Sequence, residues 1–161
     1  MSQATRYNEL CALAGNRKLD SAYHAAFYLL SNDKELFESA RKFVDHDGID
    51  FSGMKRSTRG FDERTRFIVD IAHNLFSYNS KCAATPFEIS RLGYPLMEQV
   101  CNALYIAADQ VKVVVRQNEN GKDTMEFDTE PYKKTMRTYS RMEQLTQSIA
   151  AEQAEADELE R

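Results

Sequence analysis

Apolar residues recur three or four positions apart along most of the first 110 residues, the spacing that gathers side chains on one face of an α-helix. The first such segment, 4–15, turns Leu10, Leu13 and Ala14 inward and is closed by Gly15, a residue type that often ends helices. It therefore predicts a short N-terminal helix.

Two further helices are predicted over 21–30 and, after an N-cap at Asp33, up to Val44. Together they are expected to form a helical hairpin. Their buried faces are predicted to hold Tyr23, Ala26, Phe27, Leu30, Leu36, Phe37, Ala40, Phe43 and Val44.

The helical period breaks over residues 45–60, where three glycines interrupt the pattern. This segment is predicted to be the longest loop in the centre of the chain. Phe51 and Met54 are its apolar residues and are expected to hold it against the core.

Residues typical of helix N-termini predict where the next three helices begin. Asp62 is predicted to cap a helix to about residue 78, Thr85-Pro86-Phe87-Glu88 forms a capping box that opens a short helix ending at Gly93, and Pro95 opens a helix to about residue 111. The residues predicted to face the core are Phe67, Ile68, Ile71, Ala72, Leu75, Phe76, Leu96, Val100, Leu104, Ala107, Ala108 and Val111.

The pattern changes after residue 111. VKVVVRQ is rich in β-branched residues, Asn120-Gly121 is a turn signal and TMEFDT alternates apolar with polar residues, so a β-hairpin is predicted. Pro131 then begins a helical segment with a coiled-coil-like seam. The seam residues are Tyr132, Met136, Tyr139, Met142, Leu145 and Ile149.

The predicted fold class is mainly α: a compact multi-helix body followed by a β-hairpin and a long C-terminal helix. The domain boundaries that follow are a helical body at 1–111, a hairpin at 112–130 and a helical arm with an acidic end at 131–161. Leu, Ile, Val and Phe supply 34 of the 161 residues, just above the fraction of roughly 20% below which a charged chain is expected to stay disordered.

Charge is unevenly distributed. The chain carries a formal charge of −4, yet residues 143–161 contain six acidic residues and one basic residue, which leaves the rest of the chain close to neutral. The basic first half and acidic last half of the arm oppose the helix macrodipole. Two interpretations stay open: the arm pairs antiparallel with another arm, or the seam folds back onto the body and the acidic end frays.

Cysteine usage and hydropathy bear on location. Cys11, Cys82 and Cys101 are an odd number without CxxC spacing, which favours reduced, mostly buried thiols over a disulfide framework. No stretch approaches the roughly 20 apolar residues that a membrane span requires, and the first residues lack the pattern of a secretory signal. A cytoplasmic protein without a membrane partner is expected.

Candidate chemistry is sparse. Asp45, His46, Asp47 and Asp50 crowd together but do not match the EF-hand spacing, so a capped polar turn is favoured over a metal site. No nucleophile elbow, cysteine-protease signature or glycine-rich phosphate loop occurs. No catalytic residue, metal or cofactor is therefore predicted, and the roles of His24, His46, His73 and the cysteines stay open.

Two groups of basic residues offer a second kind of site. One lies around residues 55–66 and the other on the arm at 133–141. Both are modest, and a solvated surface is favoured over nucleic-acid contact. The residues that would contact nucleic acid are Lys55, Arg56, Arg59, Lys133, Arg137 and Arg141.

The segment SAYHAAFYLLSNDKELF, with the later run LMEQVCNALYIAADQ, resembles a family of small uncharacterised helical proteins of Firmicutes and their mobile elements. The resemblance covers roughly residues 19–110 and rests on helix-core residues, so it brings no functional residue with it. It implies a phage or integrative element as the setting, and a small protein that binds a host protein, for example to inhibit a defence system.

The leading functional hypothesis is accordingly a non-enzymatic protein-protein interaction module. Its arm is expected to bind a protein partner or to form a homodimer. A nucleic-acid-associated regulator that uses the basic groups is the second hypothesis. An enzyme with no recognisable motif is the third.

Overall fold

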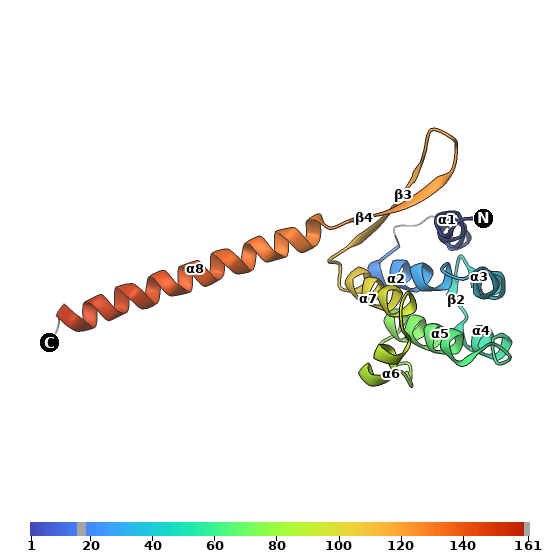
Figure 1. Cartoon of the computed structure of the whole chain (residues 1–161), viewed down its shortest axis with the longest axis horizontal. Coiled ribbons are helices and arrows are strands. Elements are labelled where there is room, and N and C mark those ends of the chain that lie inside the picture. Colours follow the sequence, from blue (N-terminus) through green and yellow to red (C-terminus); the bar gives the residue numbers. More distant parts are fainter. Residues whose placement is uncertain (16–18, 160–161) are drawn as a thin grey trace.

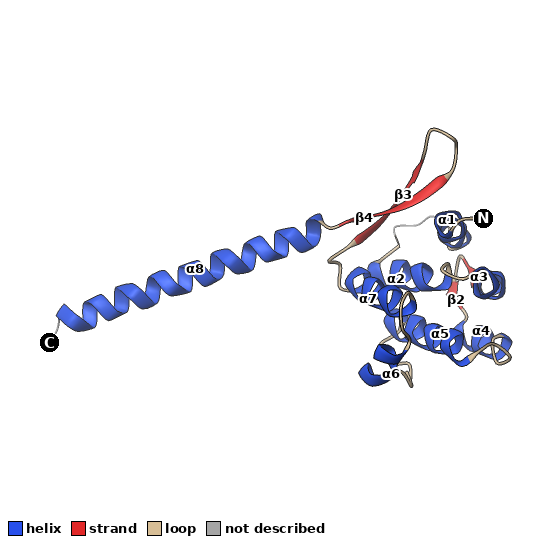
Figure 2. Cartoon of the chain, in the orientation of Figure 1, coloured by secondary structure: helices blue, strands red, loops and turns tan. Residues whose placement is uncertain are grey.

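Helices dominate the computed structural model, which describes residues 1–15 and 19–159. The helices are α1 (Gln3–Leu13), α2 (Ser21–Leu30), α3 (Lys34–Ala40), α4 (Phe51–Ser57), α5 (Glu63–Phe76), α6 (Pro86–Arg91), α7 (Leu96–Ala107) and α8 (Glu130–Leu159). Helices α1 to α7 pack into a body, a β-hairpin packs against one side of it, and the long helix α8 projects away from it (Figures 1 and 2). The prediction of a mainly α fold with a hairpin and a long C-terminal helix is confirmed.

Helix α2 is the centre of the body. Its last six residues are all buried, and it packs against both α5 and α7. An apolar run that leaves no polar face is what a helix covered on several sides requires. The core therefore forms around α2, with the fully buried rings of Phe27 and Phe37 at its heart.

The predicted caps are in place. Asp33, Asp62 and Thr85 each accept a hydrogen bond from a backbone N–H in the first turn of α3, α5 and α6, and the Glu88 side chain completes the capping box of α6. Gly93 has a φ of +71°, the left-handed conformation that ends the α6 segment. These local signals act within four residues, which is why the sequence reveals them.

The prediction of a loop over 45–60 is wrong. The segment contains the two-residue strands β1 (Val44–Asp45) and β2 (Gly48–Ile49), followed by α4. Gly53, which suggested a break, lies inside α4. A Cβ at this position would meet the Asp50 carboxylate and would come within 2.7 Å of the Phe43 ring. The glycine permits close packing rather than a turn.

Several predicted core positions differ from the structure. Val44 is buried, but on β1, and Phe43 ends a 3-10 turn (Arg41–Phe43) instead of continuing α3. Leu13 and Leu104 are 39% and 47% exposed and Ala108 is exposed too, because no other described element covers these faces of α1 and of the end of α7. Periodicity identified the helices but not which apolar residues are covered.

The hairpin pairs β3 (Lys112–Gln117) with β4 (Asp123–Asp128) in antiparallel register, with Val115 opposite Met125. Val113, Val115 and Met125 pack against the core, and the ring of Phe127 meets the ring of Tyr28 edge-on at 5.6 Å. The hairpin is thus fastened to the body, and its end directs the chain outward into α8 (Figure 1).

Candidate functional site

Helix α8 leaves the body after its first turn. The Tyr132 N–H donates to the Gln110 carbonyl at 3.0 Å, and the ring of Tyr132 meets that of Tyr105 edge-on. From there the helix projects into solvent, and none of its described residues is buried (Figure 1). The structure does not fold the predicted seam back onto the body: Tyr132 is 40% exposed and Tyr139 is 68% exposed.

The six predicted seam residues do not lie on one line. Met136 and Leu145 are nine residues apart, about two and a half turns, so they point to opposite sides of the helix. A straight stripe with alternating steps of three and four is formed instead by four of the six together with two threonines. This set, the arm stripe, is Tyr132, Thr135, Tyr139, Met142, Thr146 and Ile149, with Met136 flanking one edge and Leu145 the other.

The two threonines were missed because they are polar by type. In α8, however, the Thr135 hydroxyl donates to the Pro131 carbonyl at 3.1 Å, and the Thr146 hydroxyl donates to the Met142 carbonyl at 2.9 Å. Each hydroxyl is satisfied within its own helix, so burial of either side chain in an interface would leave no unpaired donor. A heptad count of the sequence would have found both positions.

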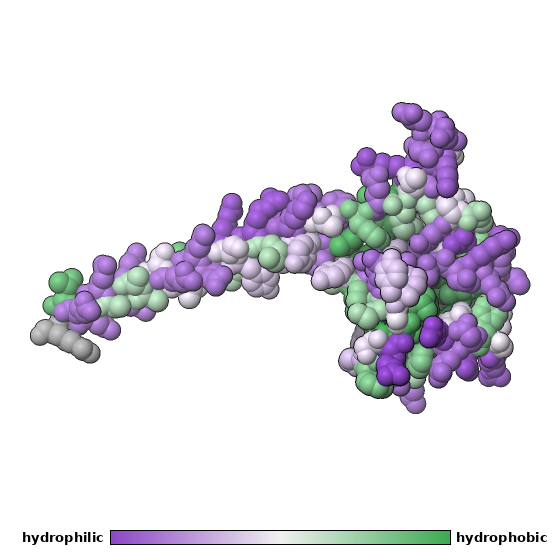
Figure 3. Space-filling model, viewed as in Figure 1, coloured by the Kyte–Doolittle hydropathy of each residue, from purple (hydrophilic) through white to green (hydrophobic). Residues whose placement is uncertain are grey.

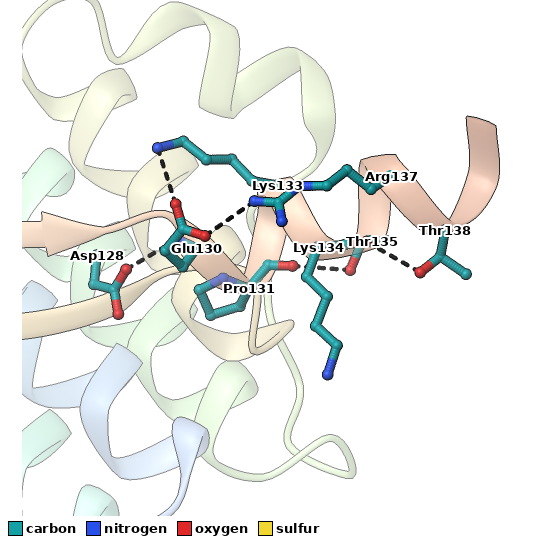
Figure 4. A network of polar contacts seen from close by, with 8 residues as sticks. All are labelled: Asp128, Glu130, Pro131, Lys133, Lys134, Thr135, Arg137 and Thr138. Carbon is teal, nitrogen blue, oxygen red and sulfur yellow. Dashed lines mark hydrogen bonds and ion pairs between the residues drawn. The ribbon is translucent and has the colours of Figure 1, made fainter. Parts of the chain in front are cut away.

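Charged side chains surround the start of α8 (Figure 4). The Glu130 carboxylate pairs with Lys133 at 3.2 Å and with Arg137 at 3.1 Å, and the Asp128 side chain accepts from the Glu130 N–H. The Lys133 ammonium, helped by Arg137, holds the pKa of Glu130 below its usual range. Two of the three arm residues predicted to contact nucleic acid are therefore already paired with a carboxylate.

The other basic group lies elsewhere. Lys55 on α4 pairs with Asp70 on α5 at 2.7 Å, and Arg56 and Arg59 follow it on α4 and in the next turn. Helix α4 is on the side of the body away from α8 (Figure 1). The two basic groups that sequence reasoning considered together do not form one surface.

A cavity of about 400 Å³ beside α2 brings together residues that sequence reasoning did not connect. His24 lines it with Asp20, Asp109 and Lys112, and behind the ring the Tyr7 hydroxyl contacts His24 Nδ1 at 2.5 Å. Tyr7 also shares a hydrogen bond with Cys11, one turn along α1. The spacing of Tyr7 and Cys11 places them on one face of α1, which was the only signal available in the sequence.

The protonation states of this cluster suit structure rather than catalysis. Burial raises the pKa of Cys11 to about 11 and raises that of Tyr7 further above its ordinary value, so both keep their protons at neutral pH. Burial lowers the pKa of His24, although a hydrogen bond to the Leu19 backbone partly offsets this. The result is a neutral hydrogen-bonded cluster without an activated nucleophile.

Acidification is expected to destabilise the body through its histidines. Burial lowers the pKa of His24 and, together with the charge of Lys55, that of His73, so below the ordinary histidine pKa of about 6.5 the unfolded chain binds protons that the folded chain does not. Stability should fall as the pH drops from about 7.5 to about 5.5, before the carboxylates titrate. Denaturant unfolding at both pH values measures this.

The paired variant His24→Gln and His73→Gln is the control, and it should show a flatter dependence over the same interval. Equal stability of the unsubstituted protein at the two pH values would contradict the expected proton uptake.

Three of the four candidate metal ligands lie together on an exposed turn. Ligand atoms of Asp45, His46 and Asp47 lie within 4.8 Å of one another on the exposed β1–β2 turn, where the Asp45 carboxylate accepts from the backbone N–H groups of Asp47 and Gly48. Asp50 instead caps α4. The segment thus has the geometry of a capped turn.

His73 and the cysteines show no convergence with that turn. The His73 ring stacks on Phe51 at 4.6 Å. Cys11, Cys82 and Cys101 are free thiols and only half-buried, not mostly buried as the sequence suggested.

Comparison with known proteins identifies no relative of this chain. No family model matches the chain, and neither a curated protein nor a solved structure matches it. Among the described residues, no helix combines the length and the apolar character needed to cross a bilayer. The features that bear on function are therefore the arm, the cavity beside α2 and the residues around them.

Proposed function

We propose that the protein is a non-enzymatic binding protein that presents the arm stripe of α8 to another protein. One observation carries the proposal: a helix of 30 residues projects from the body with none of its described residues buried, and one face of it exposes large side chains at Tyr132, Tyr139, Met142 and Ile149. Figure 3 shows polar and apolar residues interspersed along this projecting arm. Exposed apolar surface of this extent is typical of an interaction site, and a helix face is a common way to present it.

The cavity at His24 supports an enzyme less well. Its histidine is engaged by Tyr7 and by the Leu19 backbone, and the nearby thiol has a pKa of about 11. An active site built on these groups would need a proton acceptor poised near neutral pH.

The basic groups support nucleic-acid binding less well than the stripe supports protein binding. Lys55, Lys133 and Arg137 each pair with a carboxylate of the same chain, so a phosphate would have to displace that carboxylate. A host protein, such as a component of a defence system, is the first larger target proposed for testing.

A photo-crosslinking amino acid tests the proposal. Placed at Tyr139, on the stripe, it should yield a covalent adduct with a protein in cells that produce the full chain. Placed at Gln144, on the opposite side of α8, it should yield little. Equal labelling from both positions, or none from either, would mean that the stripe is not a binding surface.

A further inference from the structure

The sequence and geometry of α8 indicate which partner binds the arm stripe. We infer that it is α8 of a second copy of this chain, running antiparallel, so that two bodies are held at opposite ends of a two-helix coiled coil. This inference rests on the proposed function, because it takes the arm stripe to be the binding surface, and it identifies the partner.

The positions of the arm stripe are symmetric about its midpoint, so the stripe can pair with a second copy that runs in the opposite direction. Counted from the midpoint between Ser140 and Arg141, each stripe residue has a counterpart equally far away on the other side. An antiparallel pair centred there forms layers in which a and d positions face one another, as antiparallel coiled coils require. The facing pairs are Tyr139 with Met142, Thr135 with Thr146, and Tyr132 with Ile149.

The sizes of the facing side chains also match. Each tyrosine meets a smaller aliphatic residue, and large residues facing small ones fill an interface without voids. The threonine layer is compatible with burial because both hydroxyls are bonded to carbonyls of their own helix.

The edges of the stripe support the same register. A surface groove of about 340 Å³ runs along α8 between Lys134, Thr135, Thr138 and Tyr139. In the centred antiparallel pair, Leu145 of the second copy lies level with this groove and on the same side, so its side chain enters the groove. Met136 covers the interface from the other side. Met136 and Leu145, the two apolar residues outside the straight stripe, therefore both contact the second copy in this register.

A parallel pair is disfavoured by packing and by charge. It would stack Tyr139 on Tyr139 and would place the basic first halves of both arms side by side, with the acidic ends also together. Antiparallel pairing in this register places Glu143 of one copy level with residue 138 of the other, between Arg137 and Arg141, and places Glu152 about one turn from Lys133. It also sets the two helix macrodipoles in opposition. The basic residues are Lys133, Lys134, Arg137 and Arg141, and the acidic ones in the described part of the arm are Glu143, Glu152, Glu155, Asp157 and Glu158.

The mass of the full chain in solution tests the pairing. Light scattering over about a hundredfold range of concentration should show the mass rising from 18.5 kDa toward twice that value. The double variant Tyr139→Glu with Met142→Glu places carboxylates in the central layers and should weaken self-association about a hundredfold or more. The matched control, Ser140→Glu with Gln144→Glu, adds the same charge on the outer side and should still dimerise.

Disulfide crosslinking tests the orientation. In the antiparallel register Thr135 faces Thr146, so a mixture of the chains Thr135→Cys and Thr146→Cys should crosslink on oxidation, while either chain alone should crosslink no more than the unsubstituted protein. Strong crosslinking of Thr135→Cys with itself would indicate a parallel pair and would overturn the inference.

These outcomes separate the inference from the proposed function. A chain that stays at 18.5 kDa at every concentration, while the photo-crosslinker at Tyr139 still captures another protein, overturns the homodimer and leaves the binding role intact. Absence of both dimer and adduct overturns the two together. Circular dichroism of each variant confirms that the body remains folded.

Discussion

Replacing Phe27 by alanine is expected to lower the free energy of unfolding by about 3–5 kcal/mol, the range for a buried phenylalanine whose removal leaves a cavity. The Phe27 ring is fully buried on α2, the helix that packs on both α5 and α7. Because several elements fix its surroundings, the core cannot collapse fully into the vacated volume. Urea unfolding followed by circular dichroism measures the loss.

Phe87 supplies the matched control for this substitution. Its ring is 69% exposed on α6, so Phe87→Ala should change stability by no more than about 0.5 kcal/mol. Similar losses for the two variants would show that the body is not organised around α2.

Substituting Arg6 with alanine is expected to cost about 2–4 kcal/mol, although arginine is usually a surface residue. Its guanidinium is buried and donates to the carbonyls of Ser31, Asn32 and Met1 at 2.6, 2.6 and 2.7 Å. Two of these carbonyls follow the C-terminus of α2, where the helix macrodipole favours a positive charge. Without the guanidinium the carbonyl of the buried Ser31 loses a donor that water does not readily replace.

Arg41 serves as the comparison. It bonds Glu9 at 2.9 Å and lies near Glu38, but its side chain is 42% exposed, and a surface ion pair of this kind contributes roughly 0–1 kcal/mol. Thermal unfolding should therefore rank Arg6→Ala well below Arg41→Ala in stability. The opposite ranking would mean that the α1–α2 contact does not depend on Arg6.

Local features of the fold were predictable from the sequence. The capping box at Thr85, the N-caps at Asp33 and Asp62 and the Asn120-Gly121 hairpin turn each depend on residues a few positions apart, and all are present. The arm was also recognisable as one long helix. Its stripe needed a correction that helix geometry alone supplies, because Met136 and Leu145 are on opposite edges.

Features that join distant segments were not predictable. Gly53 suggested a loop because its own neighbours show no helical period, whereas the reason for the glycine is the ring of Phe43 ten residues earlier. Arg6 gave no sign of burial, since two of its three acceptors lie 25 and 26 residues away. The Tyr7–His24 contact likewise joins two helices that the sequence could not orient.

The sequence by itself determined where the capped helices begin, that a hairpin follows the body, and that the last segment is a helix with an acidic end. These properties arise from propensity, capping and periodicity, which act over one or two turns. Only the tertiary structure decided which apolar faces are covered. It buries those of α2 and α5, leaves Leu13 and Leu104 exposed, and sends α8 away from the body, because coverage depends on which elements meet in space.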